Sequence, residues 1–270
     1  MRIRSEAMEL GLKGRVALVT ASSKGIGLGT AKVLAGEGMK VAISSRDAAS
    51  LKKASDQIAA ATGEEVLAVA ADMTVREDLE RLVETTSRKL GGVDVLVYNT
   101  GPPKPGTFGE LTYADWEEAT RLLLLSAVTL TQAVVPHMKS KGWGRLIYIT
   151  SLTLKQPIGN LVLSNTVRLG IAGLSKSLSR ELAPHGITSN GIIQGYVRTD
   201  RTLHLMEERA SKTGTSLEEA YKEMAKSIPL GRYGEPDEVG SLVAFVASER
   251  GAYLNGGMFT IDGGFISSVF

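Results

Sequence analysis

A glycine-bearing turn near the start of the chain has the residue types and spacing that bind a dinucleotide. The β-branched run 16–20 leads into Ala21-Ser22-Ser23-Lys24-Gly25-Ile26-Gly27, and a segment of helical periodicity follows. Such a turn exposes backbone N–H groups and the positive end of a helix to a pyrophosphate. Glycine also serves ordinary strand-to-helix turns, but this turn opens a βαβ unit, which favours dinucleotide binding. The candidate binding residues here are Thr20, Ser22, Ser23, Lys24, Gly25, Ile26 and Gly27.

The end of the second predicted strand, Ser44-Ser45-Arg46, indicates which dinucleotide is bound. An enzyme that uses NAD carries an acidic residue here for the ribose 2′-hydroxyl, and Ser45 occupies that position. Without the carboxylate, Arg46 and Lys24 are expected to attract a 2′-phosphate, although a lone surface cation is often merely solvated. The pattern therefore favours NADP(H), and NAD(H) stays open.

These candidate residues must be positioned by an alternating series of strands and helices. Strands are expected at 16–20, 41–45, 66–70, 93–98, 145–150, 188–193 and 258–261, and helices at 26–36, 48–62, 75–90, 113–135 and 162–183. Repeated β-α units demand parallel strands covered by helices. The pattern predicts a single-domain α/β fold, a Rossmann-type doubly wound parallel sheet of about seven strands with helices on both faces. We expect this domain at 13–270, after a poorly ordered extension at 1–12 in which Met8 offers an alternative start.

Composition excludes several functional classes. The 270 residues are 43% hydrophobic and 22% charged, and 31 Lys and Arg balance 29 Asp and Glu without a long block of like charge, so nucleic acid is not an expected partner. The absence of cysteine and the three scattered His predict no metal site and fit a reducing compartment. The start has no apolar stretch long enough for a signal peptide, and Leu122 to Leu125 is too short to span a bilayer. We expect a cytoplasmic protein with no membrane partner.

Further motifs extend the pattern over nearly the whole chain. Asn99-Thr100-Gly101 follows the fourth predicted strand, Gly231 to Pro236 reads Gly-Arg-Tyr-Gly-Glu-Pro, and Asp262-Gly263-Gly264 follows the last strand. In this order the motifs resemble those of the short-chain dehydrogenase/reductase family, and in particular its 3-oxoacyl-[acyl-carrier-protein] reductase branch, although Ala21 replaces the first glycine of the turn. The resemblance implies further cofactor-binding residues, which are Asp72, Met73, Asn99, Gly101, Gly195, Val197 and Thr199.

The catalytic positions depart from that family. Its members use a Ser, a Tyr-x-x-x-Lys pair on one helix and an Asn, so that Lys holds the nicotinamide ribose and lowers the pKa of the Tyr that acts as acid or base. Ser151 matches, but Ser164 stands in place of the Tyr, Arg168 in place of the Lys, and Leu123 in place of the Asn. Arg168 can still bind the ribose, whereas guanidinium cannot donate a proton at neutral pH. The catalytic candidates are therefore Ser151, Ser164 and Arg168.

Two readings of these departures compete. The first is an NADP(H)-dependent oxidoreductase that acts on a small carbonyl or alcohol, with its proton supplied by Tyr196, Lys155 or a water held by Ser151 and Ser164. The second is a catalytically silent dinucleotide-binding sensor or partner subunit. A non-redox enzyme like the halohydrin dehalogenases is a third, but those proteins keep the Tyr and abandon the dinucleotide turn.

Substrate and assembly are constrained less closely. The polar segment 200–227 interrupts the alternation and suits a lid or substrate loop. Its Met206, Met224 and Leu203 either line an apolar pocket or pack together, and their helical spacing favours packing. The apolar helices 113–135 and 162–183, with the tail residues Ile266, Val269 and Phe270, predict a homotetramer.

Overall fold

Seven parallel strands form the centre of the molecule in the computed structural model, which describes residues 9–269. Their order is β3-β2-β1-β4-β5-β6-β7, so the chain moves outward in one direction from β1 and in the other from β4. The carboxyl ends of β1 and β4 are the switch point at which doubly wound sheets bind their ligands. The expected fold class is confirmed.

The strands are close to their predicted positions, with ends shifted by no more than two residues. They are β1 Val16–Val19, β2 Lys40–Ser45, β3 Leu67–Ala70, β4 Val95–Tyr98, β5 Gly144–Ile149, β6 Ile187–Gln194 and β7 Met258–Ile261. The α-helices among the described residues are α1 Gly25–Gly36, α2 Ala48–Thr62, α3 Arg76–Leu90, α4 Tyr113–Thr120, α5 Ser126–Lys141, α6 Val162–Glu181, α7 Asp200–Thr213, α8 Leu217–Lys226 and α9 Pro236–Ala247. Short helical turns cover Phe108–Glu110, Arg121–Leu125, Leu152–Leu154 and Ala183–His185.

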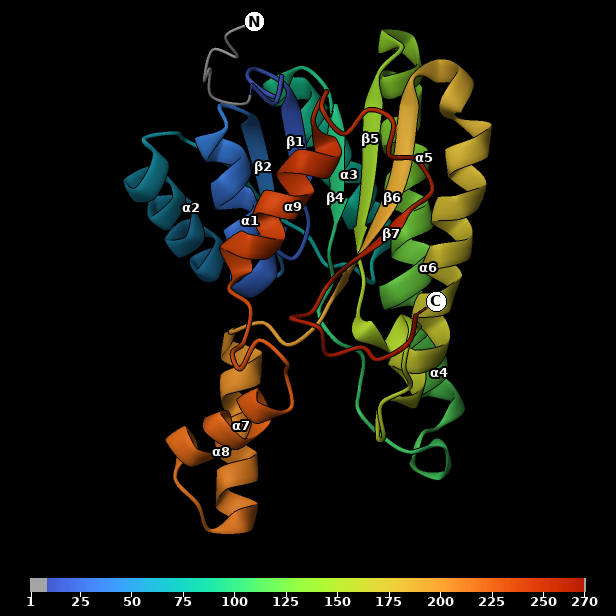
Figure 1. The fold of residues 1–270 in the computed structure, drawn as a ribbon. Coiled ribbons are helices and arrows are strands. Elements are labelled where there is room, and N and C mark those ends of the chain that lie inside the picture. Colours follow the sequence, from blue (N-terminus) through green and yellow to red (C-terminus); the bar gives the residue numbers. More distant parts are fainter. Residues whose placement is uncertain (1–8, 270) are drawn as a thin grey trace, which may run out of the picture.

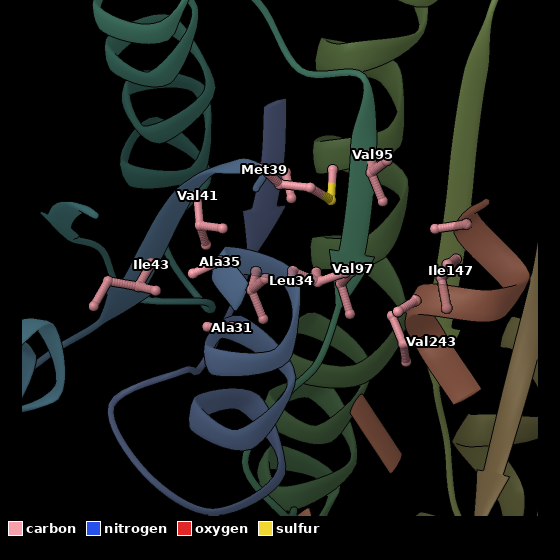
Figure 2. Close-up of a cluster of buried hydrophobic side chains, with 14 of the residues drawn as sticks. Ala31, Leu34, Ala35, Met39, Val41, Ile43, Val95, Val97, Ile147 and Val243 are labelled. Carbon is pink, nitrogen blue, oxygen red and sulfur yellow. The ribbon is translucent and has the colours of Figure 1, made fainter. Parts of the chain in front are cut away.

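Alternate residues of each strand enter two separate cores, one on each face of the sheet. On one face the side chains of Val41, Val95 and Ile147 meet α1 and α9 (Figure 2). On the other face Leu96 and Leu146 meet α3, α5 and α6 (Figure 1). Because both faces are covered, the five inner strands are almost wholly buried, whereas the edge strands β3 and β7 are partly exposed. Functional residues on the inner strands are therefore expected at the strand ends.

The longest predicted helix, 113–135, differs from the structure in two ways. It is broken by the π-turn Arg121–Leu125, and it continues through Pro136 to Lys141, where Gly142 ends it with φ +63°. Proline removes one N–H donor from a helix, which is why an end at this point was expected. By length and apolar composition alone, Tyr113–Lys141 meets the criteria for a membrane-spanning helix, with mean hydropathy 1.4. Packing accounts for part of this hydropathy, because Leu130, Val134 and Met138 lie in the core at no more than 1% exposure.

The polar segment 200–227 forms a pair of helices that project from the carboxyl edge of the sheet (Figure 1). Met206 packs with Ala210 and Ala220, and Met224 packs against this cluster, so these methionines pack rather than line a pocket. Helix α9, which follows, lies outside the helices expected above. Its signals are present in the sequence, because Pro236 occupies the first turn and Glu235 forms a capping box with Glu238.

The packed domain begins before the expected boundary at Lys13. Leu12 is 1% exposed within the core, and the carbonyl of Leu10 accepts a hydrogen bond from the N–H of Glu249. Residues 1–8 of the expected extension, including the alternative start at Met8, lie outside the described residues.

Candidate active site

The glycine-bearing turn after β1 packs so closely against the start of α1 that only small residues fit there. A side chain on Gly27 would place its Cβ 2.5 Å from the carbonyl oxygen of Ala21, so the start of α1 approaches the turn as closely as a glycine allows. Gly25 has φ +56°, in the left-handed region that favours glycine. Ala21 has φ +47° in the same region, a conformation that costs an alanine about 1–2 kcal/mol.

The turn is fixed to the end of β4 by a set of hydrogen bonds. The Thr20 hydroxyl donates to the carbonyl of Asn99 at 2.7 Å and accepts from its N–H at 2.9 Å. The Asn99 side chain donates to the carbonyl of Ala21 at 3.1 Å. On the other side, the buried hydroxyl of Ser22 accepts from the N–H of Ser44 and so joins the turn to β2. Thr20, Ser22 and Asn99 therefore shape the turn, and two strand ends hold it rigid.

The first turn of α1 is left open to an anion. Its N-cap residue Lys24 is exposed and makes no side-chain cap hydrogen bond, and the first turn contains no acidic residue. The N–H groups and the positive helix end are thus without an internal counter-charge, as a pyrophosphate site requires. Ser23 and Ile26 flank this turn and are half-buried.

The end of β2 has the chemistry of a phosphate site. Ser45 stands where a carboxylate would repel a 2′-phosphate. Its hydroxyl donates to the carbonyl of Asp47 at 3.2 Å. Arg46 is 79% exposed, and its nearest partner is Asp72, at 4.0 Å. Asp72 itself accepts hydrogen bonds from the N–H and hydroxyl of Thr74. The neighbouring Met73 is 7% exposed. Arg46 is therefore held only weakly.

The loop after β6 approaches the glycine-bearing turn. A Cβ on Gly25 would lie 3.1 Å from the methyl group of Thr199, which places Thr199 against the first turn of α1. Val197 is 4% exposed and pairs with Gly234, and the N–H of Gly195 donates to the carbonyl of Ile261. Gly101, at the end of β4, is half-buried. These predicted residues thus border the carboxyl edge of the sheet.

The three catalytic candidates are connected through a residue that the sequence did not indicate. The Ser151 hydroxyl accepts from the N–H of Thr153 at 3.3 Å, and the Thr153 hydroxyl lies 3.2 Å from the Ser164 hydroxyl. Arg168 donates from Nε to the Ser164 oxygen at 3.2 Å. Ser151, Thr153, Ser164 and Arg168 thus form one chain from the end of β5 to the second turn of α6. We call this chain of four residues the hydroxyl row.

The position that corresponds to the family's Asn is closed. Leu123 is 1% exposed and lies within the π-turn. The Tyr98 hydroxyl lies 2.9 Å from the Leu123 carbonyl oxygen and 2.8 Å from the Ser126 hydroxyl. Tyr98 is 1% exposed, and burial raises the pKa of its phenol, so the hydroxyl is a weak acid that lies out of reach of a substrate. The Tyr98 hydroxyl also lies 3.0 Å from the Leu122 carbonyl oxygen, so it is held among polar atoms of the π-turn.

Neither side chain expected to replace the missing phenol contacts the hydroxyl row. Tyr196 packs edge-on against Phe265 and Tyr233, and burial raises its pKa, which makes it a weaker acid. Lys155 is exposed after the turn Leu152–Leu154, and no hydrogen bond joins its ammonium group to a described residue. The third expected donor, a water between Ser151 and Ser164, remains a prediction.

A groove of about 530 Å³ is lined by the loop after β6 and by the helices α7 and α8. Leu203, Leu217 and Tyr221 give it an apolar wall, and Arg198 and Lys222 lie at its sides. Leu203 thus lines a groove, unlike the two methionines. Apolar walls with a few polar groups are typical of small-molecule sites.

Comparison with known proteins identifies the family. Residues 20–266 match the family model described as Enoyl-(Acyl carrier protein) reductase. The 3-oxoacyl-[acyl-carrier-protein] reductase of Aquifex aeolicus is 33% identical over 257 residues, which cover 95% of this chain and 99% of that protein. The chain is a short-chain dehydrogenase/reductase. It is thus an oxidoreductase by family, as the sequence predicted.

Solved structures of this family superpose closely on the chain. L-sorbose reductase from Gluconobacter frateurii, complexed with NADPH and L-sorbose, has a TM-score of 0.93 at 30% identity, covering 97% of this chain and all of that one. A short-chain oxidoreductase from Pseudomonas aeruginosa, bound to NADPH and described as containing an atypical catalytic center, has a TM-score of 0.87 at 29% identity, covering 96% and 99%. The fold of this family is therefore found both with NADPH and with an unusual catalytic center.

Sequence reasoning missed two residues at this site, Thr153 and Tyr98. Thr153 carries no spacing signal, because its hydroxyl meets Ser164 only when the turn after β5 folds against α6. Tyr98 ends the fourth strand, directly before Asn99. Its hydrogen bond to the Leu123 carbonyl depends on the π-turn, which the sequence did not predict.

Proposed function

We propose that the protein is an NADP(H)-dependent oxidoreductase that interconverts a small carbonyl compound and its alcohol, as the 3-oxoacyl reductases that it resembles do. The observation that carries this proposal is the glycine-bearing turn, which is rigid, open to an anion and adjacent to a β2 end without a carboxylate. An anion-binding turn is of no use to a protein that has abandoned dinucleotides. NADPH in the relatives' structures supports the same cofactor.

Different predicted residues bind different parts of the cofactor. The first turn of α1 binds the pyrophosphate, Arg46 and Lys24 bind the 2′-phosphate, and the loop that contains Val197 and Thr199 borders the nicotinamide end. Asp72 and Met73 would bind the adenine, and Arg168 would donate to the nicotinamide ribose. NADPH, when bound, supplies the hydride that reduces the carbonyl carbon.

The hydroxyl row prepares the substrate oxygen. The oxygen of Ser151 already accepts from Thr153, and its hydroxyl proton has no acceptor among the described residues, so it is free to donate to a carbonyl. Ser164 is oriented by Arg168 and Thr153. The carbonyl oxygen must also gain one proton, and a water molecule held by Ser151 and Ser164 is the source that this chain's residues favour, because Tyr196 and Lys155 do not contact the row.

Cofactor titrations test this function. By calorimetry, the unaltered protein is expected to bind NADPH about tenfold or more tightly than NADH, because Arg46 adds a charge-assisted hydrogen bond to the 2′-phosphate. Arg46→Asp should remove most of this preference. Lys53→Asp, which makes the same change of charge on the exposed surface of α2, is the matched control and should leave it unchanged. Equal affinities for both cofactors in the unaltered protein would contradict the NADP(H) assignment.

A second candidate function is a catalytically silent, dinucleotide-binding sensor or partner subunit. The specific observation in its favour is the hydrogen bond from the Tyr98 hydroxyl to the Leu123 carbonyl. Relatives with an Asn at position 123 are expected to hold a water molecule there. The two functions share the cofactor titration and differ in turnover. NADPH binding without turnover of any carbonyl compound in a broad panel supports the silent protein.

We also propose a homotetramer in the cytoplasm. Leu125 and Leu169 are large apolar side chains on adjoining helical segments, and they are 50% and 51% exposed. Association of copies through this surface would bury them. Light scattering is expected to give four times the 28.7 kDa chain mass at micromolar concentration, and a monomer would reject the assembly.

A further inference from the structure

Arg168 is a buried cation without an anionic partner. Among the described residues two arginines are buried, Arg145 at 3% exposure and Arg168 at 8%. Arg145 lies 3.9 Å from a carboxylate oxygen of Glu249 and stacks on Trp143. Arg168 forms no ion pair with any residue in the described part of the chain. A buried guanidinium is seldom left unpaired, because desolvation of its charge is costly.

The side chain of Arg168 makes one hydrogen bond to a described residue, and that residue is Ser164. A guanidinium only donates, so its Nε–H occupies one of the two lone pairs of the Ser164 oxygen, at 3.2 Å. Neither Nη atom of Arg168 is fully buried. Burial lowers the pKa of Arg168, although a guanidinium keeps its charge at neutral pH. A full positive charge therefore lies one hydrogen bond away from the Ser164 hydroxyl.

Thr153 connects Ser164 to the second serine of the site. Its N–H donates to the Ser151 oxygen at 3.3 Å, and its hydroxyl lies 3.2 Å from the Ser164 hydroxyl. Thr153 is 3% exposed, and Ser164 is the one described partner of its hydroxyl. Both serine oxygens are thus held by the polar groups of a single buried residue. Thr153 therefore fixes how the two serine hydroxyls lie relative to each other.

An anionic oxygen beside these hydroxyls would set the direction of their hydrogen bonds. Either hydroxyl of the Thr153–Ser164 pair can donate to the other. An anion accepts the Ser164 proton, and Thr153 then donates to the lone pair of Ser164 that Arg168 leaves open. Two donors on its oxygen, one of them a cation, make the Ser164 hydroxyl a stronger donor. A neutral ligand gains less from this arrangement, because it does not balance the guanidinium charge.

We propose that the hydroxyl row is an oxyanion site, in which Ser151 and Ser164 donate to a negatively charged oxygen of the ligand and Arg168 supplies the compensating charge. Thr153 is a positioning residue that acts through both serines. The ligand class is an oxygen anion on an unsaturated carbon, such as an enolate or a phenolate. The charge that develops on the oxygen of a carbonyl substrate is its transient equivalent. This inference rests on the proposed oxidoreductase function and deepens it, because the site then stabilises a charge that the missing phenol would have neutralised.

Absorbance titrations with two ionisable probes test this proposal. 4-Nitrophenol and the smaller acetylacetone are added to the protein without cofactor, over the pH range in which each probe ionises. The anion of each probe absorbs at a longer wavelength than the neutral form, so absorbance reports the ionised fraction of the bound probe. The anion of at least one probe should bind about tenfold or more tightly than its neutral form.

Variants at Arg168 and Thr153 separate the charge from the hydroxyl. Arg168→Met should remove the preference for the anion, and Arg168→Lys, which keeps the charge, should recover part of it. Thr153→Val should weaken anion binding about tenfold, and Thr153→Ser, which keeps the hydroxyl, should restore it. The matched controls are Arg180→Met at the exposed far end of α6 and Thr86→Val at a buried hydroxyl of α3. Both controls should change anion binding less than about twofold.

The melting temperature distinguishes a cation that binds a ligand from one that supports the fold. Arg168→Met removes an uncompensated buried charge and breaks no ion pair, so it should keep or raise the melting temperature while it loses the anion. A lower melting temperature together with unchanged anion binding would make Arg168 a structural residue and would contradict the proposal.

The outcomes separate this inference from the function on which it rests. If NADPH binds but neither probe binds preferentially as its anion, or if Arg168→Met and Thr153→Val change the preference no more than their controls do, the oxyanion site is wrong and the oxidoreductase stands. If NADPH fails to bind, the proposed function is wrong, and the titrations without cofactor still decide whether the row binds an oxyanion.

Discussion

The two sides of the site differ in how much of the family's chemistry they keep. At the β1 and β4 ends, Thr20, Asn99 and Gly27 retain the geometry that holds a pyrophosphate. At the β5 end and on α6, Ser151 alone retains its type, and a row of hydroxyls replaces a phenol. Backbone N–H groups bind phosphate whatever the chain's catalytic residues are, so the first side can persist while the second changes. The comparison predicts that cofactor binding and proton transfer are separable in this fold.

The largest expected effect is on catalysis, because the cofactor side should work normally while the proton-transfer side should not. General acid catalysis contributes about 10²–10⁴-fold, and the hydroxyl row contains no group with a phenol's acidity. Ordinary ketones and 3-oxoacyl thioesters should therefore turn over with NADPH far more slowly than once per second. Stopped-flow absorbance at saturating cofactor measures this. A rate of about one per second or more would mean that a better acid acts, and Tyr196→Phe and Lys155→Ala would be the first variants to compare.

Restoring the phenol sharpens the same comparison. The structure indicates that Leu123→Asn cannot act alone, because Tyr98 already occupies the Leu123 carbonyl. The combination Ser164→Tyr, Arg168→Lys, Leu123→Asn and Tyr98→Asn should raise turnover about 100-fold, within the range of general acid catalysis. The same set without Ser164→Tyr is the control, since it opens the carbonyl but adds no acid. Equal rates in the two variants would contradict the role assigned to the phenol.

On the cofactor side, Gly27→Ala should weaken NADPH binding about 100-fold or more. A Cβ at Gly27 would lie 2.5 Å from the Ala21 carbonyl and 2.7 Å from the Ser22 Cα, so the backbone of the turn must move. Gly36→Ala on the same helix is the control, because its nearest atom would be 3.9 Å away. Calorimetry gives both affinities, and the melting temperature separates lost binding from lost folding. A Gly27→Ala protein that folds and binds NADPH normally would show that the turn is not the pyrophosphate site.

The Tyr98 hydroxyl should contribute to stability rather than to cofactor binding. Tyr98→Phe removes the hydroxyl beside the Leu123 carbonyl, whereas Ser126 keeps its hydrogen bond to the Leu122 carbonyl. An unpaired buried polar group costs about 1–3 kcal/mol. Denaturant unfolding measures the loss. Tyr113→Phe is the control, since Tyr113 is 80% exposed and should change the free energy of unfolding little. A Tyr98→Phe protein as stable as the parent would mean that the π-turn does not need this hydroxyl.

How far the sequence predicted the molecule follows the same division. Strand positions and the glycine-bearing turn follow from local patterns, because buried β-branched runs and a turn between β1 and α1 are specified within about ten residues. The hydrogen bonds of Thr153 and Tyr98 depend on contacts between segments apart in the chain. The continuation of α5 through Pro136 is also tertiary, since packing of the helix outweighs one lost hydrogen bond. The sequence therefore predicts which residue types stand at the site, but not which partners each catalytic side chain contacts.

The smallest expected effect is at Ala21, the one position of the cofactor turn that departs from the family's glycine pattern. Its φ of +47° costs alanine about 1–2 kcal/mol, and glycine adopts this conformation without that cost. Glycine also gains about 0.4–1 kcal/mol of entropy in the unfolded chain, which opposes the benefit. Ala21→Gly should therefore change the free energy of unfolding by about 0 to +1.6 kcal/mol. NADPH affinity should stay within about twofold, because the hydrogen bond from Asn99 to the residue 21 carbonyl involves no side chain of that residue. Gly63→Ala at the end of α2, where φ is +77° and no atom lies within 4 Å of the added Cβ, makes the reverse change in open space and should destabilise. If Ala21→Gly lowered the stability by as much as Gly63→Ala does, the left-handed conformation at Ala21 would carry no strain, and the turn would owe its shape entirely to Thr20 and Asn99.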